Sequence, residues 1–483
     1  MNRKSGLMNK YKKLALNTAV FAIGSFGSKI LVIFLTKLYT HFLGKDELGI
    51  KELLEPTALF LQPIFTFALQ EYLIRFGLDK NYNKKEVFST SSVITLAGMV
   101  LMALVVPFLR LIPALEYLKG YTAILIVYVI TSSLRMLCQQ FVRSLDMVKL
   151  FSLDGILATL TLLIFNLIFI AGFKMGVYGF MLAVILSDFL SAAYLFIKAD
   201  LRKYAGMRFF NSKLGGEMIR FAAPLIPTIV MWTITSLSDR MFINSMHSDM
   251  VSLGKGAVGV YGTANRFPNL ISMVSTIFLS AWNMSAITEN DSADRNKFYE
   301  KVYSAYESVL FIAGAGLLFV IKPVTDILTD YTKNPELRTV YIYTPILIGA
   351  VIFMCLNQFL GSIYSATKHS KNSFWTAFGA CVVNLVMNYF LIPTWGIQGA
   401  ALATFLSYFF CFWLRIVDAR YYVPFKFNGM KCLTNTALLG VMSVIVIFDA
   451  PMKHLWTFII TVCIVVMNFS AMMSTVKKML KRA

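Results

Sequence analysis

Residues 176–187 read GVYGFMLAVILS, and residues 396–407 read GIQGAALATFLS. Glycine, glycine, alanine and serine stand at the same four places in both stretches. Three further pairs of segments match in the same order along the chain: QFVRSL at 140–145 with QFLGSI at 358–363, LGI at 48–50 with VGV at 258–260, and Ser28-Lys29 with Ser238-Asp239. The chain therefore looks like two copies of one unit. A duplicated and very apolar chain is a common sequence form of a membrane transporter.

The composition indicates a membrane protein. Of 483 residues, 57% are hydrophobic and 14% are charged, and the mean hydropathy is +0.67. A soluble protein of this length would need more polar surface. Apolar runs of about 20 residues recur along the chain, and each can cross about 30 Å of hydrocarbon. A transmembrane barrel would show short segments of alternating hydrophobicity instead. We therefore expect an all-α polytopic membrane protein.

The apolar runs predict about fourteen transmembrane helices. The expected spans are 14–41, 48–78, 86–111, 118–143, 151–173, 176–198, 220–246, 256–287, 302–328, 337–364, 372–393, 396–418, 431–449 and 453–475. They define an N-terminal six-helix lobe (1–198), a cytoplasmic linker (199–219), a C-terminal six-helix lobe (220–418) and two additional helices (419–483).

Loop charges predict the orientation. The two tails and the loops after the even-numbered spans are rich in lysine and arginine, and the opposite loops are poor in them. Both termini are therefore expected in the cytoplasm. Because six spans per copy is an even number, both copies enter the membrane in the same direction. We expect two parallel lobes around a central cleft, which opens to each side in turn.

The charge distribution and the reactive residues exclude several classes of function. A net charge of +20 comes from short loops, without an aromatic-interleaved basic patch, so no nucleic acid partner is expected. The six cysteines form no CxxC pair, and the four histidines are scattered, so neither a metal nor a catalytic cluster is indicated. No GxxxxGK[ST] motif is present, and no cofactor is expected.

Polar side chains inside the apolar spans are the candidate binding residues, because a polar group facing lipid is costly. In span 256–287 they recur at helical spacing: Asn265, Asn269, Ser272, Thr276, Ser280 and Asn283. This spacing predicts one polar face along nearly the whole span. Span 48–78 repeats the pattern with Glu52, Glu55, Gln62, Thr66 and Gln70. Helix–helix hydrogen bonding is the alternative interpretation for any single residue.

Three intramembrane cations are candidates for binding an anion. Lys29 has no acidic residue three or four positions away, Arg266 lies in the outer half of its span, and Arg135 lies near Ser132 and Gln139. Intramembrane charges are functional candidates by default. Asp239 is a further candidate, and its alternative role is a structural ion pair with Arg266.

Several segments together resemble the bacterial polysaccharide-biosynthesis flippases of the multidrug/oligosaccharidyl-lipid/polysaccharide exporter superfamily. They are ALQEYLIRFGLD at 68–79, PLIPTIVMWTITSLSDRMFI at 224–243, AVGVYGTANRFPNLI at 257–271, and the GVYG and GIQG repeats. The resemblance spans nearly the whole chain. It implies alternating access, a bacterial cytoplasmic (inner) membrane location and a cargo carried on undecaprenyl diphosphate. Relatives that flip peptidoglycan precursor use cavity arginines in their first, second and eighth spans. Arg266 fits such a position, but the first span here has Lys29.

An anionic, lipid-linked oligosaccharide also fits the residues. Lysine and arginine suit a diphosphate, and amides and hydroxyls suit sugars. We expect Lys29, Arg135 and Arg266 to hold the diphosphate, and Asn265, Asn269, Ser272, Thr276, Asp239 and Gln70 to line the same cleft. Membrane lipids, a polysaccharide polymerase and chain-length machinery are the other expected partners.

The sequence is also compatible with three other functions. One is a peptidoglycan-precursor flippase, and another is a multidrug/cation antiporter of the same superfamily, with Glu55 or Asp188 as the coupling acid. A membrane-embedded polysaccharide enzyme is the third, although no loop is large enough for a catalytic domain.

Overall fold

The structure, a computed structural model, describes residues 34–79, 81–223, 226–288, 295–367 and 369–482. These residues form helices and contain no β-strand. Eight of their helices are long and apolar enough to cross a membrane, or nine if α8 and α9 count as one bent span. The all-α polytopic architecture is therefore confirmed. The number fourteen stays a prediction, because most of span 14–41 lies outside the described residues.

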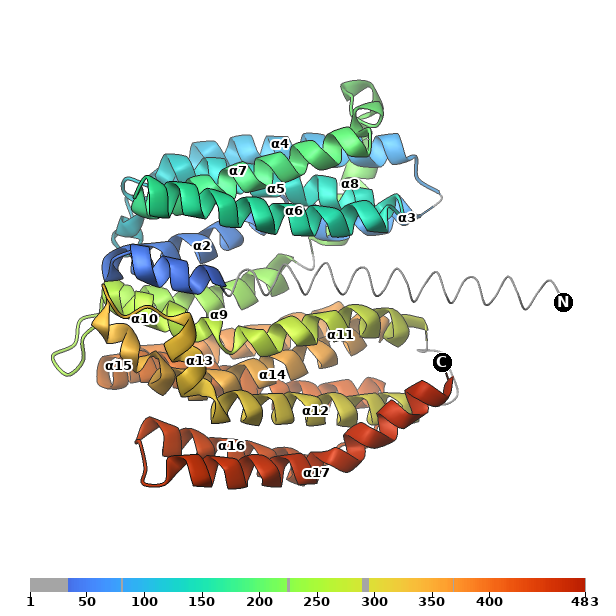
Figure 1. The fold of residues 1–483 in the computed structure, drawn as a ribbon. Helices are drawn as coiled ribbons and strands as arrows, with labels where there is room; N and C mark the ends of the chain where they lie inside the picture. The colour runs from blue at the N-terminus through green and yellow to red at the C-terminus, as the bar shows by residue number, and fades with distance from the viewer. Residues whose placement is uncertain (1–33, 80, 224–225, 289–294, 368, 483) are drawn as a thin grey trace. The chain divides into compact units, whose positions relative to one another are not determined.

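The chain divides into two compact units, Met1–Thr233 and Ile234–Ala483. The labelled elements that lie within the first unit are α2 (Lys45–Phe65), α3 (Leu69–Leu78), α4 (Lys84–Leu109), η1 (Pro113–Leu118), α5 (Thr122–Ser144), α6 (Val148–Asn166), η2 (Leu167–Gly172), α7 (Gly176–Lys198), η3 (Leu201–Lys203), η4 (Met207–Phe209) and α8 (Ser212–Ala222). Helix α5 is central, since it contacts α2, α3, α4, α6 and α7 (Figure 1).

The second unit begins inside α9 (Ile226–Ser245). Its other elements are α10 (Lys255–Arg266), α11 (Asn269–Thr288), α12 (Arg295–Phe319), α13 (Ile321–Leu328), η5 (Pro335–Thr339), α14 (Val340–Thr367), α15 (Ser370–Tyr422), α16 (Gly429–Ile447) and α17 (Lys453–Arg482). Helix α14 packs on α15, and the hairpin of α16 and α17 packs along α12 (Figure 1).

The repeated glycine motif makes the same turn in both units. Gly176 begins α7 with φ +57°, and Gly396 interrupts α15 with φ +55°, a backbone region that favours glycine. Three residues later, a Cβ on Gly179 would meet the Phe169 carbonyl oxygen at 3.1 Å, and one on Gly399 would meet the Leu391 oxygen at 2.2 Å. Each motif therefore reverses the chain and lets its two helices pack closely. Asn372 bonds Asp418 across the second reversal, as expected for separate spans at 372–393 and 396–418.

The predicted linker 199–219 belongs to the first unit and packs on the helices that precede it. Ser89 of α4 donates to the Tyr204 carbonyl oxygen at 2.6 Å, and Asn211 donates to Glu86 at 2.6 Å. Leu201 and Leu214 are buried in the same apolar cluster as Phe88 and Phe141 of the first unit. Apolar side chains in this basic segment therefore attach it to the lobe that precedes it.

Three predicted spans are broken where the sequence pattern suggested continuous helices. Span 48–78 divides into α2 and α3, because Phe67 and Ala68 have φ of 52° and 47°, a left-handed conformation that costs about 1–2 kcal/mol per residue in a helix. Span 256–287 divides into α10 and α11 at Pro268, which has no N–H to continue the helix. Span 302–328 likewise divides into α12 and α13.

Candidate functional site

A buried carboxylate, Asp239 of α9, is surrounded by donors from α10 and from both arms of α15. Its Oδ1 accepts from Asn384 Nδ2 at 3.0 Å and from Asn388 Nδ2 at 2.7 Å. Its Oδ2 accepts from the hydroxyls of Tyr261 and Thr404, each at 2.6 Å. We call these five residues the Asp239 cluster. The turn at Gly396 brings the two arms of α15 together and so places Asn384, Asn388 and Thr404 around one carboxylate.

The partners of the Asp239 carboxylate are all neutral. The sequence allowed an ion pair with Arg266, and no such pair joins these two side chains in the described structure. Arg240 instead lies over the Tyr261 ring, with its guanidinium carbon 5.6 Å from the ring centroid. Asp239 is 2% exposed, and none of the described cationic side chains contacts its carboxylate. A lone buried carboxylate is costly, which favours a proton or a bound cation.

The Asp239 cluster has the ligand chemistry of a small cation site. Its oxygens come from a carboxylate, two hydroxyls and two amides, and the Asn388 Oδ1 is buried without a donor in the described structure. Oxygen ligands of this kind suit hard cations. Sequence reasoning found Asp239 but missed Asn384, Asn388 and Thr404. The available signal was the spacing of Asn384 and Asn388, one helical turn apart in an apolar span.

The polar face predicted for span 256–287 is divided by the break at Pro268. Asn265 is half-buried in α10 and donates to the Tyr261 carbonyl oxygen at 3.3 Å. Asn269 begins α11 and is exposed, as is Thr276, while Ser272 donates to the Asn269 carbonyl oxygen at 2.9 Å. Arg266 is the half-buried last residue of α10. The break places Asn265 in α10 and the other described residues of this face in α11. The side chains of Ser280 and Asn283 lie outside the described residues, and the single polar face stays a prediction.

Arg135 is engaged by acidic residues within the first unit. Its Nη1 lies 2.8 Å from Asp188 Oδ1, and its Nη2 lies 3.8 Å from Asp154 Oδ2. The expectation that it holds a diphosphate did not include these two carboxylates. Glu55, the other candidate coupling acid, pairs with Lys51 at 2.7 Å. Lys29 and the Gln70 side chain lie outside the described residues.

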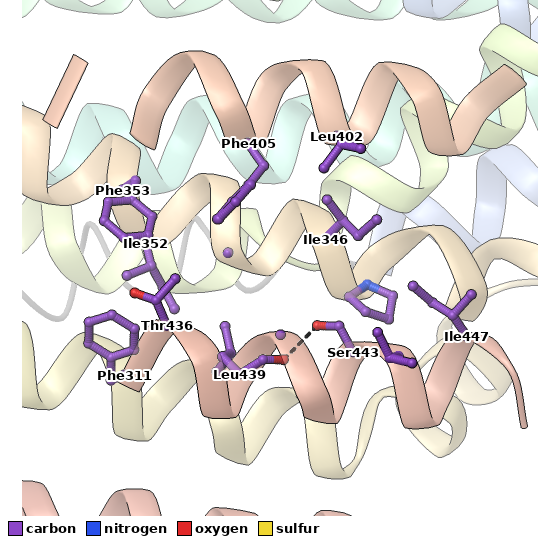
Figure 2. Close-up of a pocket in the computed structure, with 14 residues that line it drawn as sticks. Phe311, Ile346, Ile352, Phe353, Leu402, Phe405, Thr436, Leu439, Ser443 and Ile447 are labelled. Carbon is purple, nitrogen blue, oxygen red and sulfur yellow. Dashed lines mark hydrogen bonds between the residues drawn. The ribbon is translucent and has the colours of Figure 1, made fainter. Parts of the chain in front are cut away.

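An apolar pocket of about 170 Å³ lies between α12, α14, α15 and α16. Figure 2 shows Phe311, Phe405 and Leu439 directed into it from three of these helices. The hydroxyls of Thr436 and Ser443 donate to carbonyl oxygens of their own helix at 2.8 Å, so they present no free donor to the pocket (Figure 2). An apolar cavity near 150 Å³ can hold a benzene-sized group. The pocket therefore suits a hydrocarbon segment.

Comparison with known proteins supports the same architecture. The profile of the family described as "Polysaccharide biosynthesis protein" matches residues 14–283, and the MatE profile matches residues 224–390. An uncharacterized membrane protein of Methanocaldococcus jannaschii is 25% identical over 408 residues, which cover 79% of this chain and 91% of that protein.

Solved structures with this fold include two kinds of transporter. The lipid II flippase MurJ in its inward closed conformation superimposes with a TM-score of 0.66 at 16% identity, covering 96% of this chain and 100% of that one. An inward-facing multidrug resistance MATE family transporter of the MOP superfamily gives 0.62 at 13% identity, covering 83% of this chain and 98% of that one. At these identities the likeness concerns the fold alone. Because the first profile spans more than half of the sequence, the chain belongs to the polysaccharide biosynthesis protein family.

Proposed function

We propose that this protein is a flippase for undecaprenyl-diphosphate-linked oligosaccharide repeat units. It moves them from the inner to the outer leaflet of the bacterial cytoplasmic membrane, by alternating access, for surface polysaccharide biosynthesis. The match of residues 14–283 to the polysaccharide biosynthesis family carries this proposal. Both termini are cytoplasmic in this proposal, as the loop charges predict.

Cations and polar side chains supply the chemistry for such a cargo. We assign the diphosphate to Lys29 and Arg266, since a guanidinium can bind phosphate oxygens through two hydrogen bonds. Asn269 and Thr276 of α11 are exposed and offer an amide and a hydroxyl to sugars. The membrane potential favours outward movement of an anion and contributes about 2.3 kcal/mol per charge per 100 mV.

The lipid tail needs an apolar shelter while the head group crosses. Helices α16 and α17 lie outside the sequence repeat, and α16 closes one side of the apolar pocket. We assign a segment of the polyprenyl tail to this pocket, because its wall is hydrocarbon and its two hydroxyls are already bonded. The pocket volume accommodates only a short part of such a tail.

The test is export of surface polysaccharide by a strain in which this gene is replaced by variants. Lys29→Ala and Arg266→Ala should each reduce export at least tenfold while the amount of protein in the membrane stays near wild type. Arg266→Lys should retain part of the activity, because the charge remains and the planar fork is lost. Lys119→Ala is the matched control, since Lys119 is 61% exposed beside Glu116 in a loop. Normal export by both alanine variants would reject the assigned site.

A multidrug/cation antiporter is the second candidate, favoured by the match of residues 224–390 to the MatE family. The same deletion strain separates the candidates. A repeat-unit flippase leaves lipid-linked oligosaccharide in the inner leaflet when it is deleted, whereas loss of an antiporter raises drug sensitivity with normal surface polysaccharide. Rescue of cells depleted of their lipid II flippase would instead indicate peptidoglycan precursor as the cargo.

A further inference from the structure

Three helices of the first unit meet at a charged cluster that the transport proposal does not use. Arg135 comes from α5, Asp154 from α6, and Asp188 from α7. We propose that Asp154 and Asp188 form a shared proton-binding site around Arg135, which takes up and releases one proton and thereby controls how firmly Arg135 is held. This inference does not depend on which cargo the protein carries.

The two carboxylates have different hydrogen-bond partners in the cluster. Asp188 accepts from Arg135 at 2.8 Å and from the Ser132 hydroxyl. Asp154 accepts from the Ser191 hydroxyl and from Gln139 Nε2 at 3.3 Å, while Arg135 Nη2 is 3.8 Å away. Arg135 therefore neutralises Asp188 directly and Asp154 only weakly.

The charges of the cluster do not balance. Two carboxylates and one guanidinium leave a net charge of −1 when both acids are ionised. The Asp154 side chain is 0% exposed and that of Asp188 is 7% exposed, so water compensates little of this charge. Two carboxylates that share a buried site resist simultaneous ionisation, because like charges repel each other. Binding one proton makes the cluster neutral.

Among the residues that the structure describes, no other charged group near the cluster provides the missing positive charge. Tyr128 of α5 lies within electrostatic reach of Asp188 and of Glu55, whose own cation is Lys51 of α2. Cys138 of α5 lies within reach of Asp154 and adds no cation. In α2, Lys51 also pairs with the buried Glu52. The other described charged side chains of α3, α4, α6 and α7 lie at helix ends: Arg75 in the last turn of α3, Lys84, Lys85 and Glu86 in the first turn of α4, Lys149 in the first turn of α6, and Lys198 in the last turn of α7.

Arg135 is the most exposed of the three charged side chains in the cluster. Its side chain is 25% exposed, whereas both carboxylates are nearly enclosed. Its Nε is buried without an acceptor in the described structure, so the guanidinium is not fully bonded in this position. When a proton moves from water to a carboxylate oxygen, the net charge of the cluster changes from −1 to 0. The electrostatic attraction between the carboxylates and Arg135 then becomes weaker. Release of the proton restores the ion pair.

Infrared difference spectroscopy on the purified full-length protein in nanodiscs tests this inference. The signal is the carbonyl stretch of a protonated carboxyl group, followed while the pH is raised from 5 to 8, above the range of an exposed aspartate near 3.9. We expect one protonated carboxyl in the wild-type cluster, and loss of this signal in both Asp154→Asn and Asp188→Asn. Either substitution leaves one carboxylate balanced by Arg135. Arg135→Gln should about double the signal, since both acids then lack a cation.

Asp146→Asn is the matched control, because Asp146 is an exposed carboxylate in the loop between α5 and α6. Its spectrum should equal that of the wild type. Gel filtration and thermal melting check the fold of each variant, and Ser191→Ala provides a milder change. That variant removes one donor to Asp154 and leaves the three charged side chains in place. The inference is overturned if the wild type and the two asparagine variants show the same carbonyl signal at every pH, or if Arg135→Gln shows no increase.

Discussion

At the scale of single residues, burial and partners change what a charged side chain can do. Arg135 has no acidic neighbour at helical spacing in the sequence, and yet two aspartates from other helices contact it. Asp239 faces neutral donors only. The two sites therefore differ in charge balance: the aspartates of the first unit have a cation, Arg135, as a partner, whereas Asp239 has only neutral partners.

Replacing Asp239 tests whether its carboxylate organises the second unit. Asp239→Ala leaves four donors without their acceptor, at about 1–3 kcal/mol for each buried unsatisfied group, so we expect a loss of 3 kcal/mol or more. Asp239→Asn keeps the shape and should cost clearly less. The measurement is the midpoint of thermal unfolding in detergent, with exposed Asp146→Asn as the control, because asparagine tolerates the positive φ of 60° at this position. Equal midpoints for the alanine and asparagine variants would contradict this account.

The ligand chemistry of the Asp239 cluster predicts stabilisation by a small monovalent cation. If Na⁺ binds there, replacing choline by Na⁺ should raise the unfolding midpoint, because a ligand present at 100 times its dissociation constant adds about 2.7 kcal/mol. Asp239→Asn should remove the effect, since it lowers the charge of the site. If the unfolding midpoint of the wild type does not depend on Na⁺, then Na⁺ does not bind at the Asp239 cluster. A proton on Asp239 would then be the remaining explanation.

At the scale of helices, the repeated glycines explain why both copies end in a tight helical hairpin. The first glycine of each motif adopts a positive φ, and the second lies against backbone of the preceding helix. Breaks at Phe67–Ala68 and at Pro268 have a different origin. They come from residues outside the repeated motif, and they shorten two of the predicted spans.

Substitution of the second glycine should disrupt the hairpin. A Cβ on Gly399 would stand 2.2 Å from the Leu391 oxygen, so the two arms of α15 must separate, at a cost of about 1–3 kcal/mol or more. Gly316→Ala is the matched control, because nothing lies within 4 Å of the added Cβ and alanine favours a helix by about 1 kcal/mol. We expect Gly399→Ala to lower the unfolding midpoint and Gly316→Ala to raise it or leave it unchanged. A similar response of both variants would show that the contact is relieved at little cost.

At the scale of the whole molecule, the helices beyond the repeat belong to the second unit. Helix α17 packs along α12, and Lys431 of α16 donates to Ser308 of α12 at 2.9 Å. Glu307, the neighbour of Ser308, is 2% exposed. Removal of α16 and α17 therefore opens a buried charged region as well as the apolar pocket.

Filling the pocket separates a role in binding the tail from a role in packing. Nothing lies within 4 Å of a Cβ added to Gly440, which lines the pocket. Gly440→Leu should keep or raise the unfolding midpoint, because it removes a helical glycine and occupies apolar space. If the tail enters the pocket, the same variant should export at least several-fold less polysaccharide. Export at the wild-type level, with the protein stable, would exclude the pocket as a tail site.

Truncation after Tyr422 examines α16 and α17 together. We expect the truncated protein to be less stable, since the face of α12 that packs on α17 becomes exposed, and to lose transport. Membrane protein level and polysaccharide export are the measurements. A truncated protein that remains stable and exports at the full rate would show that these helices have no part in sheltering the tail.

The sequence by itself determined the class of fold, because helix-length apolar runs in a membrane protein allow little besides transmembrane helices. It also located the two hairpin turns, since a glycine with positive φ is a local requirement that the motif states directly. Only the tertiary structure decided which polar residues meet. Asn384, Asn388 and Thr404 reach Asp239 because α15 reverses at Gly396, and Asp154 reaches Arg135 because α5, α6 and α7 pack together. Helical spacing reports neighbours on one helix, whereas these contacts join different helices, and their geometry depends on how the helices pack.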